Sequence, residues 1–584
     1  MSQDSSPSEA ERAARDALES IQRCIDDRRP FVLEAGAGAG KTYSLVHALN
    51  YLIDKEGAEL IRRGQQVACI TYTNVAKDEI ESRTAGHKAV YPATIHSFCW
   101  SLIKRFQPAL REELPSIGRW PERFAEHGEI GSRLVDYDLG YPSAKGEDRV
   151  LLGHDDVLAL AIRLLDRPKF RRLMTDRYPT IFIDEYQDTD AGIAEALKTH
   201  FLDPGEGPFI GFFGDHWQKI YGSGCGKIEH TALETIDKHA NFRSVGCVVE
   251  VLNRIRPELP QISSKPKSEG SVAVYHTNSW TGERRDKYPW KGDLLPQAAH
   301  DHLEAAKRDL ETQGWDFAGK PDDTKILMLT HNILADEQGY RQLADVFSHN
   351  EAFIKKEDDR IAFFADVLEP ACAAYRDRRL GEMFAFFGGR RPAIQSLAEK
   401  REWARNMDGL LELRETGSVG DILDFLMKTR RPRLPASVER DEHELQRLSS
   451  TPEADKPDWA ERLERLRVVP YKEVVAVTAF INGRTPFSTK HGVKGAQFKN
   501  VLVVVGRGWG QYDFNQMLEY SATGVPSDAK KLAAYERARN LFYVCCSRSQ
   551  KHLAILFTLQ LSDAALTALR EWFGGENVQP LTLE

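Results

Sequence analysis

Residues 31–42 read FVLEAGAGAGKT, and this stretch decides the fold that is predicted for the chain. Its first three residues are apolar and favour a short buried strand of a parallel sheet. Alternating Gly and Ala follow, and residues 43–53, YSLVHALNYLI, favour a helix. A strand, a glycine-rich turn and a helix in this order predict a loop whose backbone N–H groups bind phosphate.

The residue types in the loop suit a nucleoside triphosphate with Mg²⁺. Glycines carry no Cβ, so the backbone can close around the phosphates. Lys41 would reach the β- and γ-phosphates, and the Thr42 hydroxyl would bind Mg²⁺. Ala35 departs from the pattern, which has glycine at this first position. The glycines predicted to contact the nucleotide are Gly36, Gly38 and Gly40.

The composition limits the class of protein. A chain of 584 residues exceeds the roughly 250–300 residues of one hydrophobic core, so several domains are expected. No apolar run is long enough for a membrane helix, and the polar N-terminus lacks the apolar core of a secretory signal, which predicts a cytoplasmic protein. The cysteines form no C-x-x-C pair, so neither a zinc site nor a disulfide framework is predicted. The net charge of −8 excludes nucleic-acid binding through bulk charge, so any such contact must come from a local groove.

A second stretch, residues 181–188, reads IFIDEYQD and supplies carboxylates. An apolar strand that ends in adjacent acids is typical of the metal-binding half of a phosphate-loop ATPase. Asp184 would hold Mg²⁺, directly or through water, and Glu185 would polarise the attacking water. Acidic pairs at strand ends are common by themselves, but together with the Gly-Lys-Thr loop they predict a site that hydrolyses ATP.

Three further segments carry groups that suit a nucleotide. Gln218 follows the apolar strand at 208–213 and offers both a donor and an acceptor, so it would sense a γ-phosphate. Residues 241–244, NFRS, provide an aromatic ring and a cation. Gln22, on a helix predicted at 10–28, has an amide that suits an adenine edge, although an exposed helical glutamine is the commoner interpretation.

The rest of the chain alternates between α/β and helical patterns. Polar and aromatic residues cluster at the ends of the early strands, the edge of an open α/β sheet where ligands bind. Residues 99–178 and 346–470 are charged and mostly helical, which predicts two helical insertions. Further strands are predicted at 66–70, 93–98, 326–329, 474–478 and 501–505.

Taken together and in order, these stretches resemble the motifs of the UvrD/Rep/PcrA group of superfamily 1A DNA helicases. Any one motif is moderately specific, but the whole series in the right order excludes coincidence. Ala35 is also usual at its position in that family. The matching stretches are AGAGAGKT (35–42), ITYTN (70–74), ATIHS (93–97), IDEYQD (183–188), GDHWQKIYG (214–222), NFRS (241–244), TKHGVKGAQF (489–498) and RNLFYVCCSR (539–548).

The resemblance implies an α/β fold of two RecA-like parallel-sheet P-loop lobes with two mainly helical insertions. ATP would lie between the lobes, and single-stranded DNA would run across them. The lobes would close on ATP and open on ADP, which moves the strand. The implied domains are lobe 1A at 1–97 and 179–240, insertion 1B at 98–178, lobe 2A at 241–345 and 471–584, and a reduced insertion 2B at 346–470.

The resemblance also assigns roles around the nucleotide. Arg243 and Arg548 match the two arginines that reach the γ-phosphate, where such a cation is worth ~10³–10⁵ in rate. Phe242 takes the place of the aromatic residue that stacks on adenine. Gln497 stands where the family usually has a glutamate that contacts the ribose, which leaves the nucleotide preference open.

DNA contacts are carried over in the same way. Hydroxyl, amide and imidazole groups suit phosphate contacts, and tyrosine suits base stacking worth ~1–3 kcal/mol. After Tyr221 the family usually has an aromatic residue and an arginine, where this chain has glycine and serine, so one stacking platform is missing. Trp217 lies nearer the nucleotide side and is not predicted to replace it. The predicted DNA-binding residues are Tyr72, Asn74, His96, Tyr221, Thr489 and His491.

Two functions agree with these features. The first is an ATP-dependent DNA helicase or translocase that moves 3′→5′, a direction that comes from the family. The second is a DNA-stimulated ATPase that senses DNA ends or single strands and regulates a partner nuclease. Compact helicases of this type occur beside OLD-family nucleases in Gabija-like anti-phage systems, and both insertions here are short. An ATPase of the structural-maintenance type is excluded because the sequence has no coiled-coil heptads.

Overall fold

The contacts of the chain divide it into two compact units. Unit 1 comprises Met1–Val272 with Val525–His552, and unit 2 comprises Ala273–Gly524 with Leu553–Glu584. No helix in the described part of the chain combines the length and the apolar character that a membrane crossing needs. The computed structural model describes residues 7–138, 142–219, 222, 224–288, 290–320, 323–328, 331–347, 351–354, 356–387, 394–449, 456–482, 485–488, 495–506 and 512–583.

Unit 1 is built on a six-stranded sheet with the order β3-β2-β6-β7-β1-β8, and every pairing in it is parallel. Its four inner strands are short and buried throughout, as the near-continuous apolar runs in the sequence predict, whereas the two edge strands are partly exposed. β1 lies between β7 and β8, but the strand that follows it in the sequence, β2, lies further across the sheet. The phosphate loop therefore leaves the sheet where the strand order reverses. The strands are β1 (Phe31–Ala35), β2 (Val67–Thr71), β3 (Val90–Thr94), β6 (Thr180–Asp184), β7 (Phe209–Gly214) and β8 (Glu234–Lys238).

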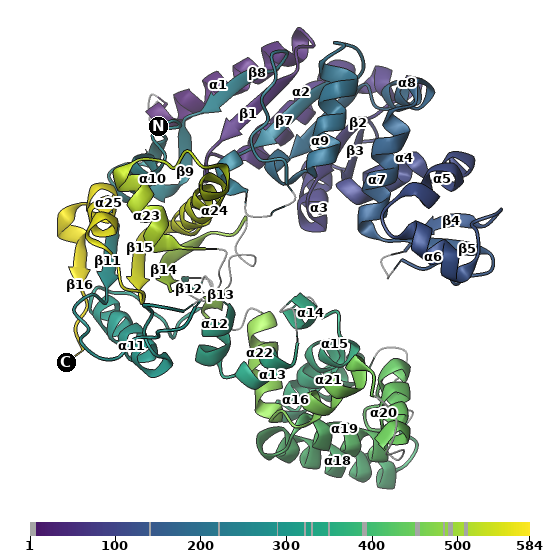
Figure 1. The fold of residues 1–584 in the computed structure, drawn as a ribbon, viewed down its shortest axis with the longest axis vertical. Helices are drawn as coiled ribbons and strands as arrows, with labels where there is room; N and C mark the ends of the chain where they lie inside the picture. The colour runs from purple at the N-terminus through teal and green to yellow at the C-terminus, as the bar shows by residue number, and fades with distance from the viewer. Residues whose placement is uncertain are drawn as a thin grey trace, which may run out of the picture. The chain divides into compact units, whose positions relative to one another are not determined.

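Helices cover both faces of this sheet (Figure 1). Successive residues of β7 show the alternation: Phe213 packs with α1 and α2, whereas Phe212 packs with α4, α7 and α9. Each face thereby has its own apolar core, and the sheet is rigid at the edge where the loops begin. The covering helices are α1 (Glu9–Asp26), α2 (Lys41–Arg63), α3 (Asn74–Arg83), α4 (Ile95–Ile103), α7 (His154–Leu165) and α9 (Ala191–Leu197).

The strand expected at 93–98 is correct only for residues 93 and 94, and the remaining four residues are helical. β3 ends at Thr94 and α4 begins at Ile95. Thr94 caps this helix, because its side-chain oxygen accepts a hydrogen bond from the backbone N–H of Ser97 at 3.4 Å. The helical segment that follows also contains a two-stranded parallel pair. Its elements are α5 (Gln107–Glu113), α6 (Trp120–His127), β4 (Leu134–Tyr137), β5 (Arg149–Leu152) and α8 (Pro168–Arg177).

Four later elements also belong to unit 1 by their contacts, and two of them carry later motifs. β9 (Ala240–Val245) continues from β8 and contains the NFRS sequence. α10 (Gly246–Ile255) follows it directly, and β10 (Ile262–Lys265) pairs with β9. α24 (Ala529–Cys546) packs against the turn that contains residues 216–218. Residues far apart in the sequence are therefore brought to one place within one unit.

Unit 2 contains most of a second six-stranded sheet, with the order β13-β12-β14-β15-β11-β16. The apolar runs predicted near 326 and 501 are strands β12 and β14, which are neighbours in this sheet. The strands are β11 (Ser271–His276), β12 (Thr324–Met328), β13 (Phe487–Ser488), β14 (Phe498–Val505), β15 (Ser549–Phe557) and β16 (Val578–Pro580), with helices α11 (Pro296–Thr312), α23 (Phe514–Thr523) and α25 (Asp563–Phe573).

The remainder of unit 2 is helical and shares one apolar core, which includes Met407, Leu423 and Tyr471. A buried ion pair joins Arg414 to Glu369 inside it, with an Nε–Oε1 distance of 2.9 Å. These helices are α12 (His331–Gln338), α13 (Arg341–Val346), α14 (Glu351–Ile354), α15 (Asp359–Phe363), α16 (Glu369–Arg376), α17 (Leu380–Ala385), α18 (Leu397–Thr416), α19 (Val419–Thr429), α20 (Ala436–Ser449), α21 (Asp458–Arg467) and α22 (Tyr471–Ile481).

The strand predicted at 474–478 is wrong, because these residues lie in α22. Their β-branched side chains favour a strand, but the buried positions Tyr471, Val474, Val477 and Thr478 recur at helical spacing. Packing of that stripe into the helical core outweighs the local preference. With two sheets built largely from parallel pairs and with many helices, the predicted α/β class of RecA-like P-loop lobes is confirmed.

Candidate active site

The phosphate loop joins β1 to α2, which begins at Lys41. Gly38 and Gly40 have left-handed backbones, with φ of +82° and +75°. A Cβ on Gly38 would lie 2.8 Å from the Cβ of Arg243 and from the Oδ1 of Asn241. Both the backbone conformation and the close neighbour therefore require glycine here, and the N-terminus of a long helix faces this loop.

Lys41 forms an ion pair with Glu185, with 2.8 Å between Nζ and Oε2. The same carboxylate oxygen accepts a hydrogen bond from Gln187 Nε2 at 2.5 Å. Glu185 follows β6 in a left-handed conformation, with φ of 50°, which is strained for a residue with a Cβ. Burial opposes the charge on Lys41, but the carboxylates of Glu185, Asp215 and Asp184 outweigh it and raise the pKa of the ammonium. The lysine is therefore a fixed cation beside the loop.

Asp184 and Thr42 supply the oxygen atoms that Mg²⁺ prefers. Asp184 is buried at the end of β6, and its Oδ1 accepts a hydrogen bond from the N–H of Glu185 at 3.0 Å. Thr42 is half-buried in the first turn of α2. A carboxylate, a hydroxyl and a glycine-lined turn at a helix N-terminus fit a magnesium nucleotide in chemistry and in shape.

A buried chain of hydrogen bonds links the end of β7 to α24. Asp215 Oδ2 accepts from Gln218 Nε2 at 2.8 Å, and Gln218 Oε1 accepts from Arg548 Nη2 at 3.1 Å. The backbone N–H of Asp215 donates to Gln187 Oε1 at 3.1 Å. Because Gln187 also contacts Glu185, the carboxylate beside Lys41 and the Arg548 guanidinium belong to one network.

Arg243 lies close to Arg548, because its Nη1 donates to the carbonyl oxygen of the preceding residue, Ser547, at 2.8 Å. Burial, followed by repulsion from Arg548, lowers the pKa of the Arg243 guanidinium. Burial also lowers the pKa of Arg548. Arg548 is buried and Arg243 is half-buried, and two guanidiniums that repel one another favour a multiply charged anion between them, such as a triphosphate.

The residues predicted to face the base are partly exposed. Phe242 keeps 37% of its surface exposed, and its backbone N–H donates to the carbonyl oxygen of Gly38 at 2.9 Å, which joins its backbone to the loop. Tyr43, which was not predicted to face the base, is 58% exposed in the first turn of α2. Gln22 is half-buried on α1. Gln497, predicted near the ribose, is exposed just before β14 in unit 2.

Three predicted DNA contacts lie at one edge of the first sheet. Tyr72 and Asn74 are exposed just after β2, and His96 follows the neighbouring strand β3. The His96 ring meets His154 edge to face at 4.7 Å, and burial, then the charge of His154, lowers its pKa. These residues occupy the carboxyl ends of two adjacent parallel strands, as predicted. The other three predicted contacts, Tyr221, Thr489 and His491, lie outside the described residues.

Arg256 was not anticipated from the sequence, because it lies outside the motifs and just after α10. It is 2% exposed, and its Nη1 lies 2.5 Å from Asp215 Oδ1. Its guanidinium also lies 5.3 Å from the centre of the Trp217 ring and 5.8 Å from that of Tyr543. Arg539 covers Trp217 at 3.6 Å, so Trp217 is a packed residue of the interior rather than a DNA platform.

Lys238 was also missed. It ends β8 with 1% exposure, and its Nζ donates to Ser44 Oγ at 2.7 Å and to the carbonyl oxygen of Gly40 at 3.3 Å. Burial lowers the pKa of this lysine to about 8. The strand reads ETIDK, with three charged residues, so its sequence does not distinguish Lys238 or identify a partner for it. Lys238 supports the phosphate loop from behind.

Comparisons with known proteins agree with this geometry. A model of the AAA domain matches residues 19–224, which contain the phosphate loop and the carboxylate strand. The Gabija protein GajB of Bacillus cereus is 24% identical, over 96% of this chain and 97% of its own length. The ATP-dependent DNA helicase PcrA of Staphylococcus epidermidis is 24% identical over 39% of this chain and 38% of its own. PcrA of Staphylococcus aureus is 22% identical over the same shares.

Proposed function

We propose that this chain, which is a UvrD/Rep/PcrA-like protein of the helicase class, is an ATP-driven motor that acts on single-stranded or tailed DNA. The observation that carries the proposal is the meeting of Lys41, Glu185 and Arg548 in one buried network of unit 1. These groups come from three distant motifs, and each has the chemistry that phosphoryl transfer requires.

Each residue has a proposed task. Lys41 and the backbone N–H groups of the loop bind the phosphates, and Thr42 with Asp184 would hold Mg²⁺. Glu185 orients and polarises the attacking water. Arg548, held by Gln218, and Arg243 stabilise the negative charge that develops during hydrolysis. ATP hydrolysis supplies the energy for movement along the strand.

The direction of movement and the domain roles are also part of the proposal. We infer 3′→5′ movement from the likeness to the PcrA helicases. We likewise infer lobe 1A at 1–97 and 179–240 with insertion 1B at 98–178, and lobe 2A at 241–345 and 471–584 with insertion 2B at 346–470. Tyr72, Asn74 and His96 would contact the DNA backbone and bases from the first sheet. We also propose a cytoplasmic location, which agrees with an activity on DNA.

A second function has a specific observation in its favour. The match to the Gabija protein GajB extends over nearly the whole of both chains, whereas the PcrA matches cover about two-fifths of each. This favours an anti-phage role, in which ATP turnover stimulated by DNA ends or single strands regulates a partner nuclease of the OLD family without strong unwinding.

Strand displacement separates the two functions. The wild type and a Lys41→Ala variant are compared on duplexes with a 3′ tail and with a 5′ tail. Unwinding of the 3′-tailed duplex alone, absent in Lys41→Ala, supports the helicase. DNA-stimulated ATPase without unwinding of either duplex supports the sensor. ATPase activity that DNA does not stimulate would contradict both.

A further inference from the structure

Residues 284–288 and 290–294 of unit 2 form the two described arms of a hairpin, which we call the 284–294 hairpin. The N–H of Arg285 donates to the carbonyl oxygen of Asp293 at 2.9 Å, and the N–H of Gly292 donates back to that of Arg285 at 2.8 Å. Gly292 has φ of +89°, so the turn uses a backbone conformation that suits glycine. The segment is thus a defined structure and not an irregular loop.

The base of the hairpin is firmly held. Arg284 Nη1 donates to the carbonyl oxygens of Gly292 at 3.1 Å and of Thr558 at 3.2 Å. Leu294 and Asp293 are each 2% exposed, and the N–H of Gln560 donates to the carbonyl oxygen of Gly292 at 3.0 Å. Anchoring of this kind fixes the direction of the tip, so a group at the tip loses little conformational entropy on binding.

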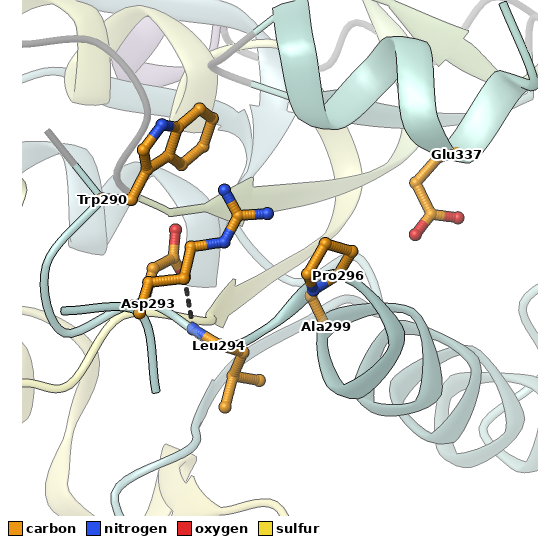
Figure 2. A pocket seen from close by; sticks show the side chains of 7 residues that line it. Trp290, Asp293, Leu294, Pro296, Ala299 and Glu337 are labelled. Atoms are coloured by element: carbon orange, nitrogen blue, oxygen red, sulfur yellow. Dashed lines mark hydrogen bonds between the residues drawn. The ribbon is translucent and has the colours of Figure 1, made fainter. Parts of the chain in front are cut away.

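The two aromatic residues near the tip have different surroundings. The Arg285 guanidinium lies 4.3 Å from the centre of the Trp290 ring. Both side chains line a pocket with Pro296, Ala299 and Glu337, and Figure 2 shows Trp290 beside it. Trp290 is therefore half-buried against its neighbours. Tyr288, two residues earlier, is 79% exposed, the largest exposed fraction among the large apolar and aromatic side chains described.

The charge around Tyr288 is positive. Residues 284–291 read RRDKYPWK, with four cationic side chains and one acidic, in a chain whose net charge is −8. Lys287 and Lys291 are exposed on either side of the tyrosine. Lysine is depleted at the centres of protein–protein interfaces, whereas lysine beside an aromatic ring suits phosphates beside a base. The tip therefore favours a nucleic acid over a protein surface.

We propose that the 284–294 hairpin is a contact site for single-stranded DNA, separate from the motifs that the sequence identifies. Tyr288 stacks on a base, and Lys287 and Lys291 contact the phosphates on each side of it. The inference deepens the proposed function, since it rests on DNA binding by this chain, and it adds a contact in unit 2 to those predicted at Thr489 and His491.

Binding of the full chain to a labelled oligothymidylate tests the site by fluorescence anisotropy. Tyr288→Ala should raise the Kd about 5- to 100-fold, because stacking on one base is lost, whereas Tyr288→Phe keeps the ring and should change it by less than about 2-fold. Lys287→Gln with Lys291→Gln should make the plot of log K against log salt less steep by about 1.4, since each phosphate contact on a single strand contributes about 0.7.

Matched controls lie elsewhere in unit 2. Phe386→Ala removes another exposed aromatic ring, and Lys400→Gln with Lys428→Gln removes the same charge from exposed positions on α18 and α19. These variants should bind like the wild type. Unchanged affinity and salt slope in every hairpin variant would overturn the inference. If the wild type bound no oligothymidylate, the proposed function and the hairpin site would both be wrong.

Discussion

Arg548 Nη2 lies 3.1 Å from Gln218 Oε1, and this hydrogen bond joins residues 330 positions apart in the sequence. Both side chains are buried, and the other end of the Gln218 amide donates to Asp215 at 2.8 Å. Gln218 therefore has a fixed orientation and holds the guanidinium. An arginine that stabilises a transition state must be held in position before the reaction, and this contact supplies the support.

Arg548→Ala should lower kcat for ATP hydrolysis by about 10³-fold or more while changing the Kd for ATP by only a few-fold, since the guanidinium acts on charge that develops in the transition state. Phosphate release and binding of a fluorescent ATP analogue measure the two quantities. Gln218→Ala should show a smaller loss of the same kind. Because Gln218 acts through Arg548, the double variant should have a kcat only slightly below that of Arg548→Ala. A kcat lowered by the product of the two single losses would contradict the coupling.

The Arg256–Asp215 pair should matter chiefly for stability. Arg256→Met leaves the buried Asp215 carboxylate without its cation and should lower the free energy of unfolding by about 3–5 kcal/mol. Adding Asp215→Asn removes the second charge and should restore part of the loss. Arg254→Met, at an exposed position in the last turn of α10 and two residues before Arg256, is the matched control and should stay within about 0.5 kcal/mol of the wild type. Urea denaturation measures all three, and equal effects of the two arginine variants would contradict the assignment.

Lys238 predicts a pH dependence of stability. Burial lowers its folded-state pKa to about 8 from an ordinary 10.5, so between these pH values the unfolded chain binds a proton that the folded chain does not. Stability should therefore rise with pH through this window, by up to about 3 kcal/mol. Lys238→Met removes the contribution. The free energy of unfolding, measured for both proteins from about pH 7.5 to 10.5, should rise more steeply in the wild type, and parallel curves would contradict the prediction.

Gly38 should tolerate no side chain. Gly38→Ala places a Cβ against Arg243 and Asn241 in a left-handed backbone, so the loop must shift. We expect a loss of ATP affinity of 10-fold or more, measured with the fluorescent analogue. Gly381→Ala is the control, because Gly381 lies in α17 with an open surrounding and should be neutral. Normal ATP binding by Gly38→Ala would show that the loop does not contact the phosphates.

Local patterns are sufficient to predict the elements around the nucleotide. The apolar runs before residues 36 and 184 are strands β1 and β6, and the helix after Thr42 is α2, because strand, turn and helix here follow from neighbouring residues. The strand predicted at 474–478 is wrong because the structure there does not follow from neighbouring residues. Its β-branched residues lie in α22, where packing against a distant helical core decides the structure.

Partners distant in the sequence cannot be found in this way. Arg256 and Lys238 lie outside recognisable motifs, and their roles depend on Asp215 and on the phosphate loop, which only the folded chain brings near. Family resemblance identifies Gln218 and Arg548 separately, but not the bond between them. The family resemblance likewise does not identify the 284–294 hairpin. Its sequence shows only a short charged and aromatic segment, and the hydrogen bonds that anchor it are known only from the structure.

The most direct test of the central claim is DNA-stimulated ATP hydrolysis by Lys41→Ala, with folding checked by circular dichroism. The matched control is Lys55→Ala, which removes an exposed lysine from the same helix. If Lys41 binds the phosphates beside Glu185, Lys41→Ala should lose turnover while Lys55→Ala keeps it. Turnover by a folded Lys41→Ala protein at the wild-type rate would contradict the site, and with it the proposal that this chain is an ATP-driven motor.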